Sequence, residues 1–522
     1  MSTVQTLTGA RWIAGLAVVL VLYRLYKHRS RRLPLPPGPK KLPLVGNMFD
    51  IPAVHTWETY MAWSNEYNSD ILHLDLAGTS VIVLSSVEAA DALLNKRSAI
   101  YSDRPRFPMV MELMGWSFNV ETQVRTHLGD EWRAHRRLLT QGFTAKASAK
   151  YRPKQLAATH ELLRRIMQGP DDFMVHFRHW AADITMRVTY GIDVQPVNDP
   201  YVSLARAAVA PLSIAGVPGK YLVDSLPILK YVPSWFPGAG FKRDAARWSK
   251  LARQMADVPL AETKRQIELG IAPSSFVADG FKALKERGNT YYTENTLRAM
   301  AGTLYVGGAD TVVSAMASFV LGMLANPEAQ RTAQAEIDLV TQGKRLPNFE
   351  DEAVMPFVAA IVKETLRWKN VLPIAVPHYL NVADEFRGYS IPANSIVIGN
   401  TWAILHDETV YPDPYEFKPE RFLSDGKLNT AVPNPEAAFG FGRRACPGKH
   451  MANASVWVAI ASILATFDIT KAVDKDGQEI QPSYEFDSGF INNPLPFKCS
   501  IQPRCENAET LVAATNQGRC VG

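Results

Sequence analysis

The sequence predicts a mainly helical protein with a minor β region, built as a single large domain behind an N-terminal membrane anchor. Three observations carry this prediction. An apolar run stands near the N-terminus, directly before a basic cluster. Long stretches have the pattern and end signals of helices, whereas strand-like alternation is confined to short segments. No linker divides residues 51–500, and a chain of 522 residues that is 47% hydrophobic has ample material for one large core.

The charge balance and the cysteines argue against several classes of protein. Lysine and arginine total 56 and aspartate and glutamate total 51, which argues against nucleic acid as the main partner. Three of the four cysteines, Cys499, Cys505 and Cys520, stand in the last stretch without nearby histidines. The chain therefore suggests neither a disulfide scaffold nor a zinc array, and it fits a reducing, cytosolic environment.

Residues 1–26 are predicted to form a transmembrane anchor. The run 12–23 is apolar throughout, but it is shorter than the ~20 residues of a full span. Extended to 7–26, it tolerates Arg11 and Arg24 near its ends, because long basic side chains can reach the interface. The basic cluster that follows puts the bulk of the chain in the cytosol by the positive-inside rule. A cleaved signal peptide is the alternative, but it would need charge before the apolar run and small residues after it.

Residues 27–50 are expected to join this anchor to a globular domain of residues 51–505. The proline-rich middle of this segment predicts a stiff, extended hinge. At the start of the domain, residues 71–84 alternate between apolar and polar side chains around a glycine and predict a β-hairpin. Residues 87–96 read as a short helix. Residues 506–522 read as a polar C-terminal tail without an assigned role.

Large apolar side chains in residues 102–123 allow two interpretations. The stretch reads as a loop that contains Phe107, Met109, Met111, Met114, Trp116 and Phe118. Such a run is most often part of a core. Soft, adaptable side chains also suit a pocket for an apolar ligand.

Trp132 and Arg136 lie four residues apart, on one face of a predicted helix. An indole N–H and a guanidinium are both donors suited to carboxylates. The alternative interpretation is an ordinary basic helix face.

The segment from Thr293 to Asn326 predicts one long helix with two glycines, Gly307 and Gly308, in its middle. Each glycine inside a helix costs ~1 kcal/mol against alanine, so the pair needs a reason. Close helix packing is one reason. The other is a widened helix that leaves room for a small ligand beside the carboxylate and hydroxyl of the Asp310-Thr311 pair.

A further helix is predicted around residues 353–369. Its Glu364 and Arg367 share a face, and such a pair is worth little on a solvated helix. Small strands are expected within residues 388–398.

The segment 439–448 carries the strongest chemical signal, because a cysteine follows a turn with two glycines. Residues 449–461 read as a helix, and proline is favoured at a first helical position, which puts Cys446 at or next to the N-cap. A helix start favours an anion, and the thiolate is the form of cysteine that binds metal. Gly440 and Gly442 allow a tight turn close to a flat ligand. Arg443 and Arg444 offer charge to an acidic group on that ligand.

Three other interpretations of this segment compete. Its glycine spacing matches a dinucleotide-binding fingerprint, but the preceding residues 433–436 cannot form the apolar strand which that motif requires. Cys446 and His450 have the spacing of half a zinc site, without an evident second ligand pair. A buried structural cysteine at a helix start is the simplest alternative.

Segment 439–448 resembles the haem-binding loop of the cytochrome P450 family at every defining position. In that family the matching cysteine, Cys446 here, gives the proximal thiolate to haem iron, which favours O–O cleavage. The resemblance implies the cytochrome P450 fold, with haem b as cofactor and Cys446 as the metal ligand. Phe439, Gly440, Arg444 and Gly448 are the cofactor-binding residues that it implies in this loop.

Other segments match the family in order, from the anchor to about residue 500. The resemblance implies that Trp132, Arg136 and His378 bind the haem propionates. It assigns proton delivery during oxygen activation to Asp310 and Thr311, although Val312 stands where the family commonly has threonine or serine. The remaining match is a buried structural triad of Glu364, Arg367 and Arg421.

The resemblance implies a monooxygenase that activates O2 and oxidises a hydrophobic small molecule. Electrons would come from NADPH through a separate NADPH–cytochrome P450 reductase, with cytochrome b5 as a second candidate donor, because the chain shows no flavin domain of its own. Segment 208–242 resembles basidiomycete members of the family, which oxidise terpenoids and, in one branch, an indolic amine. A terpenoid of fungal secondary metabolism is the favoured substrate, and a polycyclic aromatic or an indolic amine is the alternative.

The order of anchor, basic cluster and proline hinge resembles microsomal members of the family. It implies a single-pass protein of the endoplasmic reticulum membrane with its catalytic domain on the cytosolic face. Two other functions stay open. One is a haem-thiolate isomerase or dehydratase that needs no reductase. The other is a non-catalytic haem sensor, in which Asp310 and Thr311 would be idle.

Overall fold

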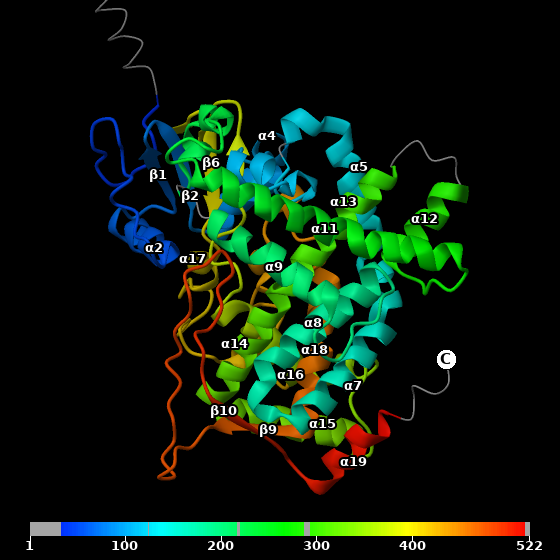
Figure 1. Ribbon diagram of the computed structural model, residues 1–522. Coiled ribbons are helices and arrows are strands. Elements are labelled where there is room, and N and C mark those ends of the chain that lie inside the picture. The colour runs from blue at the N-terminus through cyan, green and yellow to red at the C-terminus, as the bar shows by residue number, and fades with distance from the viewer. Residues whose placement is uncertain (1–32, 124, 217–219, 287–292, 517–522) are drawn as a thin grey trace, which may run out of the picture.

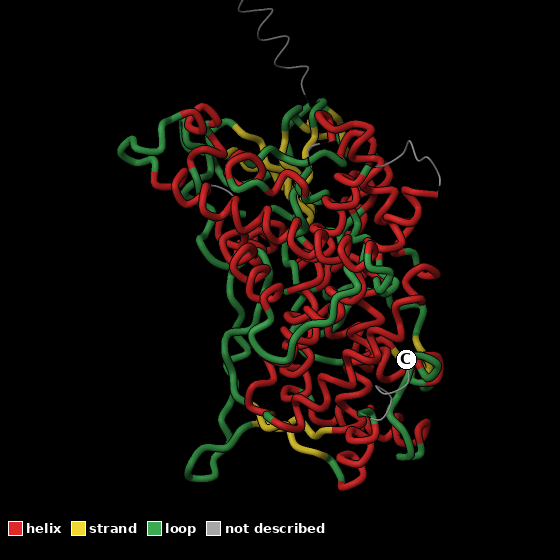
Figure 2. The backbone as a smooth tube through the Cα atoms, turned by 45° about the vertical axis from the view of Figure 1, so that its right-hand side comes forward, coloured by secondary structure: helices red, strands yellow, loops and turns green. Residues whose placement is uncertain are grey.

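The computed structural model describes residues 33–123, 125–216, 220–286 and 293–516. The predicted anchor over 1–26 lies outside these residues. Helices fill most of the molecule, and the strands gather at its two ends (Figures 1 and 2). The longer helices are α5 Arg125–Phe143, α7 Arg152–Gln168, α8 Phe173–Thr189, α9 Pro200–Ala215, α11 Gly240–Glu268, α12 Phe276–Glu286, α13 Glu294–Ala309, α14 Thr311–Ala325, α15 Pro327–Thr341, α16 Pro356–Trp368 and α18 Lys449–Thr466.

Shorter elements complete the fold. The shorter helices are α2 Thr56–Glu66, α3 Val87–Ala90, α4 Ser98–Tyr101, α6 Ala145–Ser148, α10 Leu222–Ser225, α17 Thr401–Leu405 and α19 Glu506–Ala514. The strands are β1 Ile71–Leu76, β2 Thr79–Leu84, β3 His378–Leu380, β4 Asp384–Phe386, β5 Tyr389–Ile391, β6 Ser395–Gly399, β7 Leu423–Ser424, β8 Lys427–Leu428, β9 Phe467–Lys471 and β10 Cys499–Pro503.

The largest sheet has four strands in the order β1-β2-β6-β3. Strands β1 and β2 form the predicted hairpin, in which Leu76 pairs with Thr79 around the two-residue turn Ala77-Gly78. Both turn residues have positive φ, which glycine adopts freely and which matches the twist of the strands. Strand β6 runs parallel to β2 and antiparallel to β3, so the sheet brings His378 beside the N-terminal hairpin.

Helices α8, α13, α14, α16 and α18 share the main hydrophobic core. Helix α18 is buried on all sides from Ser455 to Leu464, as expected for a helix that is apolar all round. Among the described residues, one helical stretch, Glu294–Ala325, which joins α13 and α14, is long and apolar enough to cross a membrane. Two-thirds of it is buried inside the protein, so it acts here as a core helix.

The structure corrects several boundaries. The helix expected from Thr293 to Asn326 is two helices, α13 and α14, which meet at Asp310. Residues 87–96 form α3 and a following π-helical turn, and the expected loop 102–123 contains two short helical turns. In that loop, five of the six large apolar side chains are buried and four of these belong to the main core, which favours the core interpretation.

The expected polar tail over 506–522 is different in its described part. Residues 506–514 form helix α19, which packs on α7 and α18 and buries Ala508 and Val512. The fold class predicted for the described chain, mainly helical with small sheets in a single large domain, is confirmed.

Candidate active site

The loop that ends at Cys446 is shaped by two glycines. Gly440 has φ +77° and ψ −167°, a backbone region that is open to glycine alone. Gly442 has φ +56°, and a Cβ there would collide with the carbonyl oxygen of Leu94. The Cys446 N–H donates to the Phe439 carbonyl at 2.7 Å and closes the loop, while the Phe439 ring packs against the main core. This geometry holds the cysteine in one place.

The Cys446 thiol faces an internal space. Its side chain has a large accessible surface, yet the surrounding protein raises its pKa to about 11, with burial as the largest cause and the Glu121 charge as the next. A thiol that lies inside the molecule and lines an internal space has both properties, a large accessible surface and a pKa that burial raises. The Gly448 N–H, Arg136 and Lys449 lower the pKa, but not enough to offset burial.

Helix α18 begins at Lys449 with Gly448 as its N-cap, so Pro447 does not hold the first helical position as the sequence analysis expected. Cys446 stands two residues before the N-cap. The Gly448 N–H lowers the pKa of the thiol as expected near a helix start, but burial raises it more, so stabilisation of the thiolate by the helix start stays a prediction. A metal ion on the sulfur would supply the missing positive charge, because coordination deprotonates a thiol outright.

Arg444 is almost fully buried beside this loop. Its guanidinium donates to the carbonyl oxygens of Ser102 at 2.8 Å, Val120 at 2.8 Å and Gln123 at 2.9 Å. It also lies over the Trp132 ring, 4.4 Å from the ring centroid. Burial lowers the Arg444 pKa to about 9, because carbonyls satisfy the donors without neutralising the charge. The Trp132 indole N–H is buried and has no hydrogen-bond partner.

Arg136 and Arg104 converge on one carboxylate, that of Glu121. Arg136 donates to Glu121 at 2.9 Å and also bonds to the carbonyl of Ala445, directly before the cysteine. Arg104 lies 3.6 Å from the same carboxylate and donates to the Pro377 carbonyl at 2.9 Å. Burial lowers the Arg104 pKa to about 10, and the charge of Arg136 adds to this effect. We call Arg104, Arg136 and Arg444 the cationic cluster.

His378 is buried at the start of β3. Its Nδ1 lies 2.8 Å from the carbonyl oxygen of Tyr101, and burial lowers its pKa well below the usual value. The imidazole is therefore neutral, its Nδ1–H donates to Tyr101, and its Nε2 carries no proton. His378 can donate from Nε2, as the predicted propionate role requires, only when a nearby anion raises its pKa.

The two glycines of α13 have separate functions. A Cβ on Gly308 would lie 2.6 Å from the Thr185 hydroxyl on α8, so this glycine permits close helix packing. A Cβ on Gly307 would meet nothing within 4 Å, so this glycine faces open space. The Thr311 hydroxyl donates to the Gly307 carbonyl at 2.8 Å. The close-packing interpretation holds for Gly308, and Gly307 has the open space that the ligand interpretation requires.

Asp310 lies at the junction of α13 and α14. Burial raises the pKa of its carboxyl group, while the charges of Arg178 on α8 and Arg206 on α9 lower it. Both arginines are exposed. Asp310 therefore stands between the buried helix face and two cations that reach solvent.

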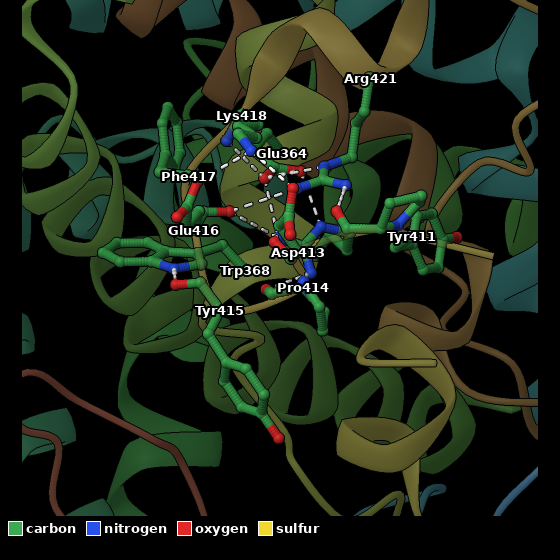
Figure 3. A network of polar contacts seen from close by, with 12 residues as sticks. Glu364, Trp368, Tyr411, Asp413, Pro414, Tyr415, Glu416, Phe417, Lys418 and Arg421 are labelled. Carbon is green, nitrogen blue, oxygen red and sulfur yellow. Dashed lines mark hydrogen bonds and ion pairs between the residues drawn. The ribbon is translucent and has the colours of Figure 1, made fainter. Parts of the chain in front are cut away.

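Glu364, Arg367 and Arg421 form a buried ion network (Figure 3). Arg367 donates to both oxygens of Glu364 at 2.7 Å, and neither side chain has accessible surface. Arg421 donates to Glu364 at 3.2 Å, and the Lys418 N–H adds a bond of 2.8 Å to the same carboxylate. Because Arg367 also binds the carbonyls of Leu405 and Pro414, this network joins α16 to the chain that leads to the cysteine loop.

Comparison with known proteins decides the family. The family profile described as Cytochrome P450 matches residues 36–501. The chain belongs to the cytochrome P450 family. The sequence-based recognition is thereby confirmed, including its basidiomycete affinity.

Several fungal relatives of this cytochrome P450 are similar over nearly their whole length. Cytochrome P450 monooxygenase 98 of Postia placenta is 45% identical over 94% of this chain and 95% of its own. Cytochrome P450 monooxygenase ple1 of Rhodocybe pseudopiperita is 41% identical over 95% of both chains. Tryptamine 4-monooxygenase of Psilocybe cyanescens is 40% identical over 95% of this chain and 98% of its own. These names identify the chain as an oxidoreductase of the monooxygenase class.

The residues of this cytochrome P450 fit a haem, the cofactor that the family implies. The thiol of Cys446 faces an internal space, and a metal ion on its sulfur would lower the pKa that burial raises. The cationic cluster holds three arginines near the carboxylates of Glu121 and Asp103, so acidic groups of a cofactor would find positive charge to pair with. The unpartnered Trp132 N–H is a further donor. No group of three or more His, Cys, Asp or Glu side chains in the described chain could hold a separate metal ion.

Sequence reasoning missed Arg104 and Glu121. Both stand in the stretch 102–123, which drew attention only for its apolar side chains. A signal was present, because charged residues in an otherwise apolar segment are buried only when they have partners. The pairing itself depends on tertiary contacts with Arg136 and Val376.

Proposed function

We propose that this cytochrome P450 hydroxylates or oxidises an apolar small molecule with O2 and with electrons from NADPH, delivered by a separate reductase. The observation that carries this proposal is the Cys446 thiol facing an internal space beside the cationic cluster. Helix α13 packs on α5, which carries Trp132, and α14 packs on α18, which follows the cysteine loop. A substrate would bind in the open space beside Gly307.

In this proposal Cys446 ligates the iron, and the cationic cluster with Trp132 binds the propionates. Haem, when bound, supplies the activation of O2. The protein sets the access and the pose of the substrate.

Asp310 and Thr311 are proposed to carry protons to the reacting oxygen. Burial raises the pKa of Asp310, which favours uptake of a proton by its carboxyl group. Its position beside Arg178 and Arg206 supports exchange with solvent. The Thr311 hydroxyl would leave the Gly307 carbonyl and donate toward the open space.

The proposed substrate is a terpenoid, with a polycyclic aromatic or an indolic amine as alternatives. The printed name of one relative, tryptamine 4-monooxygenase, supports the indolic alternative. Apolar side chains in the segment 222–236, among them Leu222, Ile228, Tyr231 and Trp235, are largely exposed. They support a membrane-facing lid, through which a lipid-soluble substrate would enter.

We also propose that residues 1–26 anchor the protein in the endoplasmic reticulum membrane, with residues 27–50 as the hinge and 51–505 as the haem domain. The extended chain from 33 to 40, which leads into the domain, supports a hinge. Cytochrome b5 is a second candidate electron donor. Extraction of microsomes at alkaline pH tests the anchor, because a spanning protein stays in the pellet whereas a peripheral one is released.

Turnover tests the function. Terpenes, polycyclic aromatics and indoles are incubated with holoprotein, a fungal reductase and NADPH under labelled O2. The expected result is an oxidised product that carries one labelled oxygen and requires the reductase. Rearrangement of an organic hydroperoxide without reductase would favour the isomerase or dehydratase. Ligand binding without any turnover would favour the haem sensor.

A further inference from the structure

Ser314 lies one turn after Thr311 on the helix face that carries the proposed chemistry. Gly307, Thr311 and Ser314 are spaced by four and three residues, which places them on one side of the helix. The junction at Asp310 keeps this relation, because the Ser314 N–H still donates to the Asp310 carbonyl at 3.1 Å. Ser314 therefore lies on the same side of the helix as Gly307, about two turns further along.

The Ser314 hydroxyl bonds outside its own helix. It donates to the backbone carbonyl of Asn492 at 2.6 Å. By contrast, the hydroxyls of Thr303 and Thr311 donate to carbonyls four residues earlier in the same helix, the usual choice for such side chains. Ser318, one turn later, is equally buried and has no partner for its hydroxyl. The bond from Ser314 is thus a tertiary link.

The other end of this link is the tip of a hairpin turn, residues 485–495. The Leu495 N–H donates to Glu485 at 2.9 Å, and the Asp487 N–H donates to Asn493 at 2.8 Å. Figure 1 shows the segment between β9 and β10 extending from the small sheet toward the end of the molecule that holds β1 and β2. Because the tip of the hairpin lies far from β9 and β10, its position depends on contacts that the tip itself makes.

Asn492 also joins the tip of the hairpin to the segment that begins at Val371. Its N–H donates to the Val371 carbonyl at 2.9 Å. The chain from Val371 continues to Val376 and Pro377, whose carbonyls bind Arg104 of the cationic cluster. The hairpin tip thus lies between the helix face of Thr311 and a segment that ends beside the proposed haem site. Phe490, two residues before Asn492 in the tip, is 39% exposed.

We propose that Ser314 is a positioning residue for the substrate: its hydroxyl fixes the tip of the 485–495 hairpin against the reacting helix face. The inference rests on the proposed function of the site. With the bond in place, Phe490 and Ile491 hold one position against the apolar body of a substrate. Without it, the Asn492 carbonyl is left unpaired in a buried place, and the tip moves to satisfy it.

The test compares Ser314→Ala with Ser318→Ala in the full-length holoprotein. Both variants remove one hydroxyl from a fully buried serine of α14, but only Ser314 has a partner. Hydrogen–deuterium exchange of the 485–495 peptide reports the anchoring directly. Optical titration with imidazole and with 4-phenylimidazole measures the apolar contacts of the pocket, because both azoles ligate haem iron and only the second carries an apolar ring.

Ser314→Ala is expected to speed hydrogen–deuterium exchange in the 485–495 hairpin. The same variant is expected to bind 4-phenylimidazole about fivefold more weakly, in line with one lost buried hydrogen bond. Imidazole affinity is expected to stay within about twofold in the same variant, since no apolar contact is involved. Ser318→Ala is expected to match the wild type in all measurements.

Equal exchange in the two variants would overturn the inference. An equal loss of affinity for imidazole and for 4-phenylimidazole in Ser314→Ala would also overturn it, because that result means general damage to the haem site. Failure of the wild-type holoprotein to bind imidazole would instead contradict the proposed haem function, and the exchange comparison would still decide whether Ser314 anchors the hairpin.

Discussion

Single side chains in the site carry charge that the protein itself does not neutralise. Arg444 donates to three backbone carbonyls, and Arg104 donates mainly to carbonyls. Such bonds satisfy the donors but leave the charge, which is why burial lowers the pKa of both arginines. An acidic cofactor group would raise these pKa values again and gain binding energy from the same charges.

The role of Thr311 can be tested by removing its hydroxyl. Thr311→Ala is expected to lower the yield of oxidised product per NADPH by about a hundredfold, the lower end of the contribution of a positioned proton donor. NADPH should still be consumed, because reduction does not need the hydroxyl. Product and NADPH are measured together in the reductase-supported reaction.

Thr341→Ala is the matched control for this experiment. The Thr341 hydroxyl also donates to a carbonyl four residues earlier, but it does so in α15. An unchanged product yield in Thr311→Ala, or an equal fall in both variants, would refute the proton-delivery role.

The buried carboxylate of Glu364 makes a strong prediction about stability. Glu364→Gln leaves the guanidinium of Arg367 buried without its counter-charge, which should cost about 3–5 kcal/mol. Thermal unfolding of the holoprotein and its haem content measure the effect.

Glu328→Gln provides the comparison, because Glu328 and Arg331 form the same Glu-x-x-Arg pair on the exposed surface of α15. No measurable change is expected there, since exposed pairs contribute little. Equal behaviour of the two variants would mean that the buried network does not stabilise the fold.

The element that organises the distal side is the pair of helices α13 and α14. Its sequence predicts one helix, because the apolar pattern runs without interruption through Asp310. The junction arises from tertiary packing, which a periodicity argument does not include: Gly308 lies against Thr185, while Gly307 faces open space.

The two glycines should therefore respond in opposite ways to alanine. Gly308→Ala should destabilise the protein by about 1–3 kcal/mol, because its Cβ would overlap the Thr185 hydroxyl on α8. Gly307→Ala should stabilise it by up to ~1 kcal/mol through helix propensity. Thermal melts of both variants check the signs, and a stable Gly308→Ala would contradict the packing described here.

Elements with local signals were predicted well. The hairpin of β1 and β2 follows from alternation around Gly78, α16 follows from apolar periodicity, and α18 follows from a long apolar run after the cysteine loop. Helix α18 begins at Lys449, where the predicted helix 449–461 starts, but Cys446 lies two residues before the N-cap and not at or next to it, because proline preference is local whereas bonds close the cysteine loop.

At the scale of the whole molecule, the C-terminal segment is part of the domain. Helix α19 buries Ala508 and Val512 against α7 and α18, although its sequence looks polar. Two buried side chains in nine residues give too weak a pattern to distinguish a docked helix from a tail. The charged partners of the cationic cluster were missed for a related reason, because they come together only through the fold.

Substitution of Val512 tests whether α19 belongs to the cooperative fold. Val512→Asp should lose the ~1.5–3 kcal/mol of a buried valine and expose residues 506–514 to protease. Ala513→Asp places the same charge on the adjacent exposed position and should have no effect. Equal cleavage and equal melting of the two variants would show that α19 contributes nothing to stability.

The central claim is that Cys446 thiolate holds haem iron. It is tested most directly by the visible spectrum of the reduced, carbon monoxide-bound protein, recorded for the wild type, Cys446→His and Cys505→Ser. We expect a strongly red-shifted Soret band in the wild type and in Cys505→Ser, and its loss in Cys446→His. Absence of that band from well-folded, haem-loaded wild type, or its persistence in Cys446→His, would contradict the assignment.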